Sequence, residues 1–186
     1  IVGGNFPRLA WWGIVAVDLL EKRLRETRPY EATHGETEKV YWECIFKVCD
    51  SVRAKRFPDK EMKEAKEAFS RIAVTNPGSR PVVGVVGEIY VRSNRFSNEN
   101  LVKKLEALGA EVRLPTISEW IFYTNFTGKR KSWRRSNYPD FLRVILHDFF
   151  QHKDEKKLEN ILNGDLRGGP AAEVRDIDGE QPLVVL

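Results

Sequence analysis

The stretch PVVGVVGEIYVRSNRFSNENLVKKLEALGAEV, residues 81–112, decides the fold that this sequence predicts. Four valines between residues 82 and 86 form an almost continuous β-branched run, which is typical of a parallel strand buried on both faces. A polar loop follows, in which Ser97 is the expected cap of a helix that runs to Leu108. Gly109 then supplies the left-handed stop that ends many helices.

A second strand and a second helix follow this stretch. Residues 110–115, AEVRLP, predict a short strand, and Ser118 begins the expected helix SEWIFYTNF. Strand, helix, strand, helix is a βαβα unit, which implies a right-handed crossover and a parallel sheet. We therefore expect an α/β fold with a Rossmann-like parallel sheet module over residues 77–126. A helical flank, residues 1–76, precedes it.

The flank predicts three helices. An apolar segment, residues 8–27, must stop before Pro29, because proline disfavours helix in the residue ahead of it. THGE at 33–36 then matches a capping box, with Thr33 as cap and Glu36 reaching back. The apolar stripes of the next two helices are Tyr41, Cys44, Ile45, Val48 and Val52, then Met62, Ala65, Phe69 and Ile72. The turn-rich TNPGSRP, residues 75–81, ends the flank.

Residues 127–163 predict a basic loop and a helical C-terminal region. The loop TGKRKSWRRSNY, 127–138, places five cations beside Trp133, so it could bind phosphate groups or serve as a solvated connector. Helix is expected from Pro139 onward, with a break at HKDEKK. The tail, 164–186, predicts either an edge strand or a segment cut from a longer protein.

Composition limits the classes of function. The 186 residues are 41% hydrophobic and 31% charged, with a net charge of +4, which favours anionic partners slightly but does not predict a nucleic-acid binder. The longest apolar run, residues 9–20, carries Asp18 and falls short of the roughly 20 residues of a membrane span. No charged region precedes that run, so we expect no signal peptide, no membrane partner and a cytoplasmic location.

The cysteines and histidines predict no metal site. Cys44 and Cys49 share a helix, where five residues turn them about 140° apart around its axis. Two ordinary thiols are therefore expected, with Cys44 on the core face. The three histidines are scattered, and the spacing of His147 and His152 does not suit a pair of ligands on one helix.

The nucleotide-binding motifs do not fit the loop after the valine run. A P-loop needs a lysine and a hydroxyl residue after its glycines, and the dinucleotide fingerprint needs three glycines at the turn into the helix. GVVGE, residues 84–88, has neither arrangement. The chain ends IVGGN and GDLRGGP resemble serine-protease ends, but the nucleophile position holds Leu166 and Arg167, and the helical pattern contradicts a β-barrel.

The candidate site residues follow from position. Ligands of parallel α/β sheets bind beyond the carboxyl ends of the strands. Glu88 follows the first expected strand and Glu119 the second, so we expect these glutamates to act as acid, base or hydrogen-bond acceptor. The candidates for substrate binding are Tyr90, Arg92, Asn94, Arg95 and Ser118. The alternative for Glu88 is a structural carboxylate that bonds nearby backbone amides or Arg92.

Three segments carry a family resemblance: AWWGIVAVDLLEKRLRETRPYE, the quoted stretch, and PTISEWIFYTNF. In order and spacing they resemble a middle segment of the activase-related branch of the 2-hydroxyacyl-CoA dehydratase superfamily, over about residues 6–126. The resemblance is weaker through residue 163. It implies a cytoplasmic protein of anaerobic metabolism, with Rossmann-like domains around a cysteine-bound 4Fe-4S cluster. Related dehydratases and benzoyl-CoA reductases use that cluster on an acyl-CoA thioester.

Two departures shape the functional expectation. The family's cluster-binding cysteine motifs and the glycine-rich ATP site of the activase have no match here. The resemblance therefore implies a domain that contributes cleft walls to an acyl-CoA dehydratase or reductase, while other domains or subunits hold the cluster and ATP. The competing hypothesis is a non-catalytic binding or assembly module, whose Trp-rich helix and basic loop dock a partner.

Overall fold

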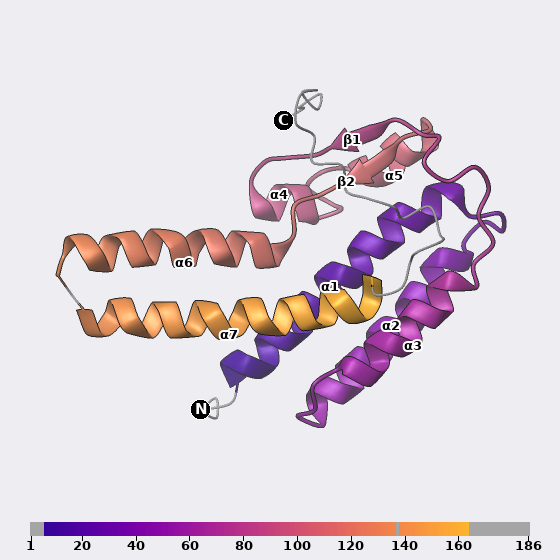
Figure 1. The fold of residues 1–186 in the computed structure, drawn as a ribbon. Helices are drawn as coiled ribbons and strands as arrows, with labels where there is room; N and C mark the ends of the chain where they lie inside the picture. Colours follow the sequence, from indigo (N-terminus) through magenta and orange to yellow (C-terminus); the bar gives the residue numbers. More distant parts are fainter. Residues whose placement is uncertain (1–5, 137, 164–186) are drawn as a thin grey trace.

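A computed structural model describes residues 6–136 and 138–163 of the chain, and these residues are mostly helical (Figure 1). In chain order the elements are α1 Phe6–Thr27, η1 Arg28–Tyr30, α2 Glu36–Arg53, α3 Asp59–Ser70, β1 Val82–Gly84, α4 Ile89–Ser93, α5 Leu101–Ala107, β2 Glu111–Arg113, α6 Ile117–Arg134 and α7 Tyr138–Asn163. The tail, 164–186, lies outside the described residues, so the structure does not test the expected edge strand.

The core lies between α1, α2, α3 and the second half of α7. Trp11 and Trp12 are buried in it, and their indole nitrogens donate to the Gln151 carbonyl and the Asp154 carboxylate of α7 at 3.2 and 2.7 Å. These tryptophans therefore belong to the core and are not exposed to a partner. The expected stripe of α3 is confirmed, since all four of its residues are buried, as is the burial of Cys44.

The sheet has two strands, so the expected Rossmann-like module is wrong. β1 and β2 are parallel, with Val83 opposite Val112, and the described residues add no third strand. Of the four valines only Val85 is buried, while Val82 is 46% exposed. A β-branched run predicts an interior strand only when other strands cover its edges. Here β1 ends after three residues, and its outer edge carries no neighbour within the described residues.

The connection between the strands is partly as expected. Gly109 takes a left-handed φ of 95°, and its amide and that of Ala110 donate to the Glu106 and Leu105 carbonyls, which is a Schellman motif. The expected cap at Ser97 is wrong. α5 begins only at Leu101, and the Ser97 amide instead donates to the Asn94 side chain at 3.0 Å.

The expected capping box at the start of α2 is also wrong. Gly35 is the cap residue, and its backbone has a left-handed conformation that residues other than glycine rarely adopt. No side-chain hydrogen bond from this cap position reaches the helix amides. The carboxylate of Glu31 takes that role, accepting from the amides of Gly35 at 2.7 Å and Thr37 at 2.8 Å. A carboxylate from outside the helix thus satisfies amides of its first turn.

The expected basic loop is part of a helix. α6 continues to Arg134, and α7 runs without a break through the HKDEKK segment, so the two form a long antiparallel hairpin that projects from the body (Figure 1). Lysine and arginine are good helix formers, so a run of basic residues does not by itself predict a loop. Within the described part of the chain, no helix has the length and apolar character needed to cross a membrane.

Candidate functional site

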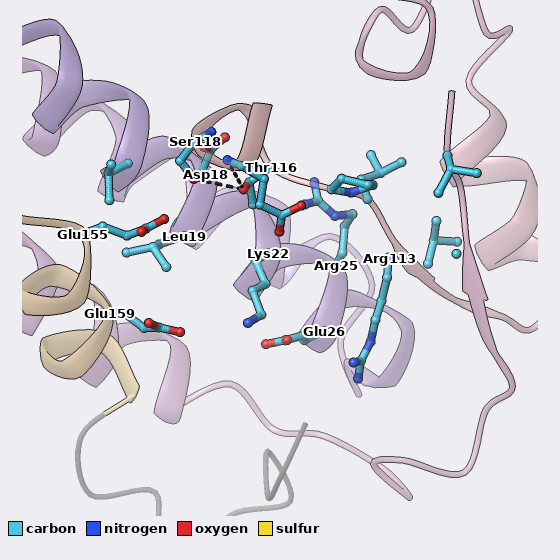
Figure 2. Close-up of a pocket in the computed structure, with 17 residues that line it drawn as sticks. Asp18, Leu19, Lys22, Arg25, Glu26, Arg113, Thr116, Ser118, Glu155 and Glu159 are labelled. Atoms are coloured by element: carbon cyan, nitrogen blue, oxygen red, sulfur yellow. Dashed lines mark hydrogen bonds between the residues drawn. The ribbon is translucent and has the colours of Figure 1, made fainter. Parts of the chain in front are cut away.

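A pocket of about 390 Å³ opens where both strands of the parallel pair end. Gly84 and Val86 line it after β1, and residues 113–116 line it after β2. One side of α1 forms the floor, and Glu155 and Glu159 of α7 close the opposite wall (Figure 2). The expectation that a hollow adjoins the carboxyl ends of the strands therefore holds for this pair, although the sheet is small.

Asp18 fixes the first turn of α6 against this pocket. Its carboxylate accepts from the backbone amides of Ile117 at 3.2 Å and Ser118 at 2.7 Å (Figure 2). Thr116 caps the same turn by accepting from the Glu119 amide. Three of the amides that a helix start leaves unpaired are thus satisfied, and a negative charge lies at the positive end of the helix dipole.

Ser118 lies at the centre of the buried part of the site. Its side chain is 2% exposed, and its hydroxyl lies 2.9 Å from that of Thr116. Burial raises the pKa of Asp18, although the hydrogen bonds from the Ser118 and Ile117 amides oppose that rise. Burial likewise raises the pKa of Glu155, against a hydrogen bond from Ser118. The pocket therefore holds two carboxyls that keep a proton to higher pH than usual.

Cations face these acids across the pocket. Lys22 makes no ion pair within the described part of the chain, and in Figure 2 its side chain lies between Glu159 and Glu26. Arg113 donates to the Glu111 carboxylate through long contacts of 3.3 Å, and its side chain is 44% exposed. Both cations can therefore turn toward an anionic group of a ligand without breaking a strong contact.

The rest of the lining is apolar. The apolar residues are Val15, Leu19, Val86, Val112, Leu114 and Pro115. Apolar walls with a few charged groups are typical of sites for small organic ligands, and the volume falls in their usual range. The arrangement can hold an apolar chain, contact an anionic group through Lys22 or Arg113, and present the Glu155 carboxyl as a proton donor.

The structure separates the predicted site residues into two groups. Ser118 and Glu119 line the pocket, the first buried and the second exposed. The other five, Glu88, Tyr90, Arg92, Asn94 and Arg95, do not line it. They lie on α4 and the turns beside it, so that the two predicted glutamates do not meet in this pocket.

The residues around α4 have local structural roles. Glu88 is exposed and caps α4 by accepting from the Val91 amide at 3.0 Å, which agrees with the alternative of a structural carboxylate. Asn94 accepts from the amides of Phe96 and Ser97 in a tight turn. Tyr90 is 63% exposed. These contacts explain the polar composition of the loop without a ligand.

Sequence reasoning missed most of the pocket. Asp18, Lys22, Arg113, Glu155 and Glu159 were not predicted as site residues. Asp18 did give a signal, because an acid inside an apolar run of a buried helix needs a partner in the folded protein. The two glutamates of α7 gave none, since their segment, HKDEKKLE (152–159), has the composition of an exposed helix face.

A 4Fe-4S cluster does not fit the described residues. Such clusters need several thiolate ligands, and the two cysteines both lie on α2. Burial raises the pKa of Cys44 to about 11, which keeps its sulfur as a thiol. No group of three or more potential metal ligands occurs among the described residues. We therefore derive no chemical step through a cluster on this chain.

Comparisons with known proteins give no relative from which to assign a function. The chain matched no protein-family model, no curated protein and no solved structure.

Proposed function

We propose that this chain is a domain of a cytoplasmic acyl-CoA dehydratase or activase-related iron–sulfur protein. In this proposal it contributes walls of the substrate cleft, while other domains or subunits hold the cluster and the ATP site. The observation that carries the proposal is the pocket at the carboxyl ends of β1 and β2, with a buried Ser118 and an unpaired Lys22. The sequence resemblance supplies the class of substrate.

The pocket suits the acyl end of a thioester. Its apolar walls accommodate a short acyl chain, and Lys22 or Arg113 contacts an anionic group of the ligand. The raised pKa of the Glu155 carboxyl, which burial causes, makes it the best proton donor toward a carbonyl or hydroxyl oxygen. Glu119 lies at the rim, where it accepts a hydrogen bond from the ligand.

A binding experiment tests this assignment. Acetyl-CoA and free coenzyme A are titrated into the full chain by calorimetry, and Lys22→Gln is compared with the wild type. A hydrogen bond to a charged group contributes about 1.5–3 kcal/mol, so we expect Lys22→Gln to weaken binding of acetyl-CoA at least about tenfold. Lys39→Gln on the exposed side of α2 is the matched control. Equal binding by wild type and Lys22→Gln would overturn the proposal.

A second candidate, a non-catalytic binding or assembly module, is favoured by the hairpin. Large apolar side chains are exposed along both of its helices, among them Trp120, Tyr123 and Phe126 on α6 and Leu142 and Phe149 on α7. Apolar surface of this extent on a soluble domain marks an interaction site. This second candidate is tested by measuring whether a partner binds the hairpin, whatever the pocket binds.

A further inference from the structure

One face of α7 carries a row of exposed apolar side chains, which we call the α7 stripe. Its members are Tyr138, Leu142, Ile145, Leu146, Phe149 and Phe150, and each is between 38% and 61% exposed. The stripe lies on the half of α7 that projects from the body (Figure 1), and it begins at Tyr138, whose ring packs edge-on against Trp133 of α6. The side chains of the other five members are each at least 38% exposed.

The spacing of the α7 stripe is that of a helix-pairing seam. Tyr138, Leu142, Ile145 and Phe149 follow one another at intervals of four, three and four residues. This alternation is the heptad pattern that packs one helix against another. The stripe spans about three helical turns, or roughly 17 Å at 1.5 Å per residue. A second helix of similar length would cover it.

Cations border both ends of the stripe. Lys153 and Lys156 continue it toward the C-terminus, and neither makes an ion pair within the described residues. At the other end, Arg134 and Arg135 are exposed at the tip of the hairpin and are likewise unpaired there. An apolar seam that ends in cations on both sides is complementary to an apolar seam that ends in acids.

The same charges disfavour a second copy of this chain. Parallel pairing of two stripes would bring each cationic end against its equal, and antiparallel pairing would bring Lys153 and Lys156 against Arg134 and Arg135. Like charges meet in both arrangements, which destabilises the pair. In neither orientation, therefore, do two copies of the α7 stripe bring opposite charges together.

A lipid surface fits α7 less well than a helix does. Helices that lie in the membrane interface have a polar face rich in lysine and arginine. α7 carries five acidic residues and four lysines or arginines, and it is therefore not a basic helix.

From these observations we propose that the α7 stripe is the docking site of an amphipathic helix whose apolar seam carries acidic residues at both ends. This proposal deepens the second candidate function, since it names the partner class, and it does not depend on the pocket. The helix belongs to another domain or subunit of the same assembly. The cations at both ends fix its position along α7.

The test uses two designed peptides and the full chain. One helical peptide of about 18 residues has leucine at a and d and glutamate at the other positions of its first and last turns, and the second peptide has lysine in place of each glutamate. Binding is measured by fluorescence anisotropy at low and high salt. We expect the glutamate peptide to bind at least about tenfold more tightly than the lysine peptide, with a smaller difference at high salt.

Two variants of the chain show whether the glutamate peptide binds at the α7 stripe. Leu142→Ser with Leu146→Ser removes two exposed seam residues, and Phe46→Ser on α2 is the control, since Phe46 is 65% exposed and distant in the sequence. Burying one leucine contributes about 1.5–3 kcal/mol, so the double variant should weaken binding at least about tenfold while the control does not. Circular dichroism verifies that each variant is folded.

Three results would overturn the proposal. The first is equal affinity for the two peptides, and the second is binding that Leu142→Ser with Leu146→Ser leaves unchanged. The third is sedimentation showing that the chain forms a dimer, or binds phosphatidylserine vesicles, in a way that this double variant abolishes. A negative acetyl-CoA titration would change none of these three results. The pocket proposal and the α7 stripe proposal can therefore be refuted independently.

Discussion

The Oδ2 atom of Asp18 accepts a hydrogen bond of 2.7 Å from the Ser118 amide, joining α1 to α6 across 100 residues of sequence. Oδ1 of the same carboxylate bonds the Ile117 amide. Because Asp18 is 5% exposed, water cannot replace it as acceptor. This contact holds the first turn of α6, which brings Ser118 and Glu119 to the pocket, against α1.

Loss of the Asp18 carboxylate should therefore destabilise the fold. Asp18→Ala removes a helix cap and leaves two buried amides unpaired, which costs about 1–3 kcal/mol in the free energy of unfolding. Asp18→Asn keeps one oxygen acceptor and should lose less. Urea denaturation measures both, with Asp50→Ala at an exposed position of α2 as control. Equal midpoints for Asp18→Ala and the control would contradict this role.

The ion pair between Arg28 and Glu106 should couple the strand connection to the helical body. The guanidinium makes two contacts of 2.8 and 2.9 Å with the carboxylate, and both side chains are about nine-tenths buried. A double-mutant cycle with Arg28→Ala and Glu106→Ala should give a coupling energy of about 1–3 kcal/mol.

The exposed pair Arg71 and Glu67, four residues apart on one helix, is the matched control. A double-mutant cycle on this exposed pair should give a coupling energy of at most about 0.5 kcal/mol. A coupling energy for the Arg28 pair as small as that of the control would show that the contact does not hold α5 in place.

Glu31 predicts a specific pH dependence of stability. Burial alone would raise the pKa of Glu31, but the hydrogen bonds from Thr37 and Gly35 outweigh it and hold that pKa below its ordinary value of 4.5. The folded state therefore binds this proton less readily than the unfolded state. The stability contributed by the carboxylate is complete above pH 4.5 and is lost as the pH falls through the lowered pKa.

Glu31→Gln measures this contribution. At pH 7 the variant should be less stable than the wild type by about 1 kcal/mol, as for other helix caps, and the difference should shrink toward pH 3. Thermal unfolding across this pH range gives both values. A difference that is independent of pH would show that the charge of Glu31 plays no part in capping α2.

Glu155 should give the stability a pH dependence opposite in sign to that of Glu31. Burial raises its pKa, so the folded state binds the proton more readily than the unfolded state, and stability falls as the pH rises above 4.5 toward the raised pKa. Glu155→Gln removes the charge and should increase stability at pH 8 while leaving it nearly unchanged at pH 4. Denaturant unfolding at the two pH values tests this. Destabilisation at pH 8 would mean that the carboxylate is needed structurally.

The cysteines should differ in reactivity. Cys44 is buried with a pKa of about 11, whereas Cys49 is half-buried on the same helix. The thiolate is the reactive form, so in the native protein Cys49 should react with a thiol reagent at pH 7.5 at least about tenfold faster than Cys44. Single Cys→Ser variants assign the two rates. Faster reaction of Cys44 would contradict its place in the core.

Much of the helical body could be predicted from the sequence, because its periodicity is strong. Met62, Ala65, Phe69 and Ile72 repeat at helical spacing and are all buried. The glycine stop at 109 was also predictable, since few other residues adopt its positive φ. These features depend on local geometry and on one apolar face.

The errors came from features that depend on distant contacts. The valine run after residue 81 has the composition of an interior strand, but the number of strands beside it is a tertiary property. Glu31 caps α2 from outside the helix, so the capping-box pattern pointed to the wrong carboxylate. The pocket combines α1, β2, α6 and α7, whose proximity no local pattern contains.

The proposed ligand site is best tested by NMR, by mapping the backbone amide shifts that change when acetyl-CoA is added to the isotope-labelled full chain. We predict that the largest changes fall at Gly84, Val86, Ser118 and Glu119, around the pocket, and that Lys22→Gln reduces them. Changes confined to the basic tip of the hairpin, residues 129–135, or the absence of any change, would contradict this prediction.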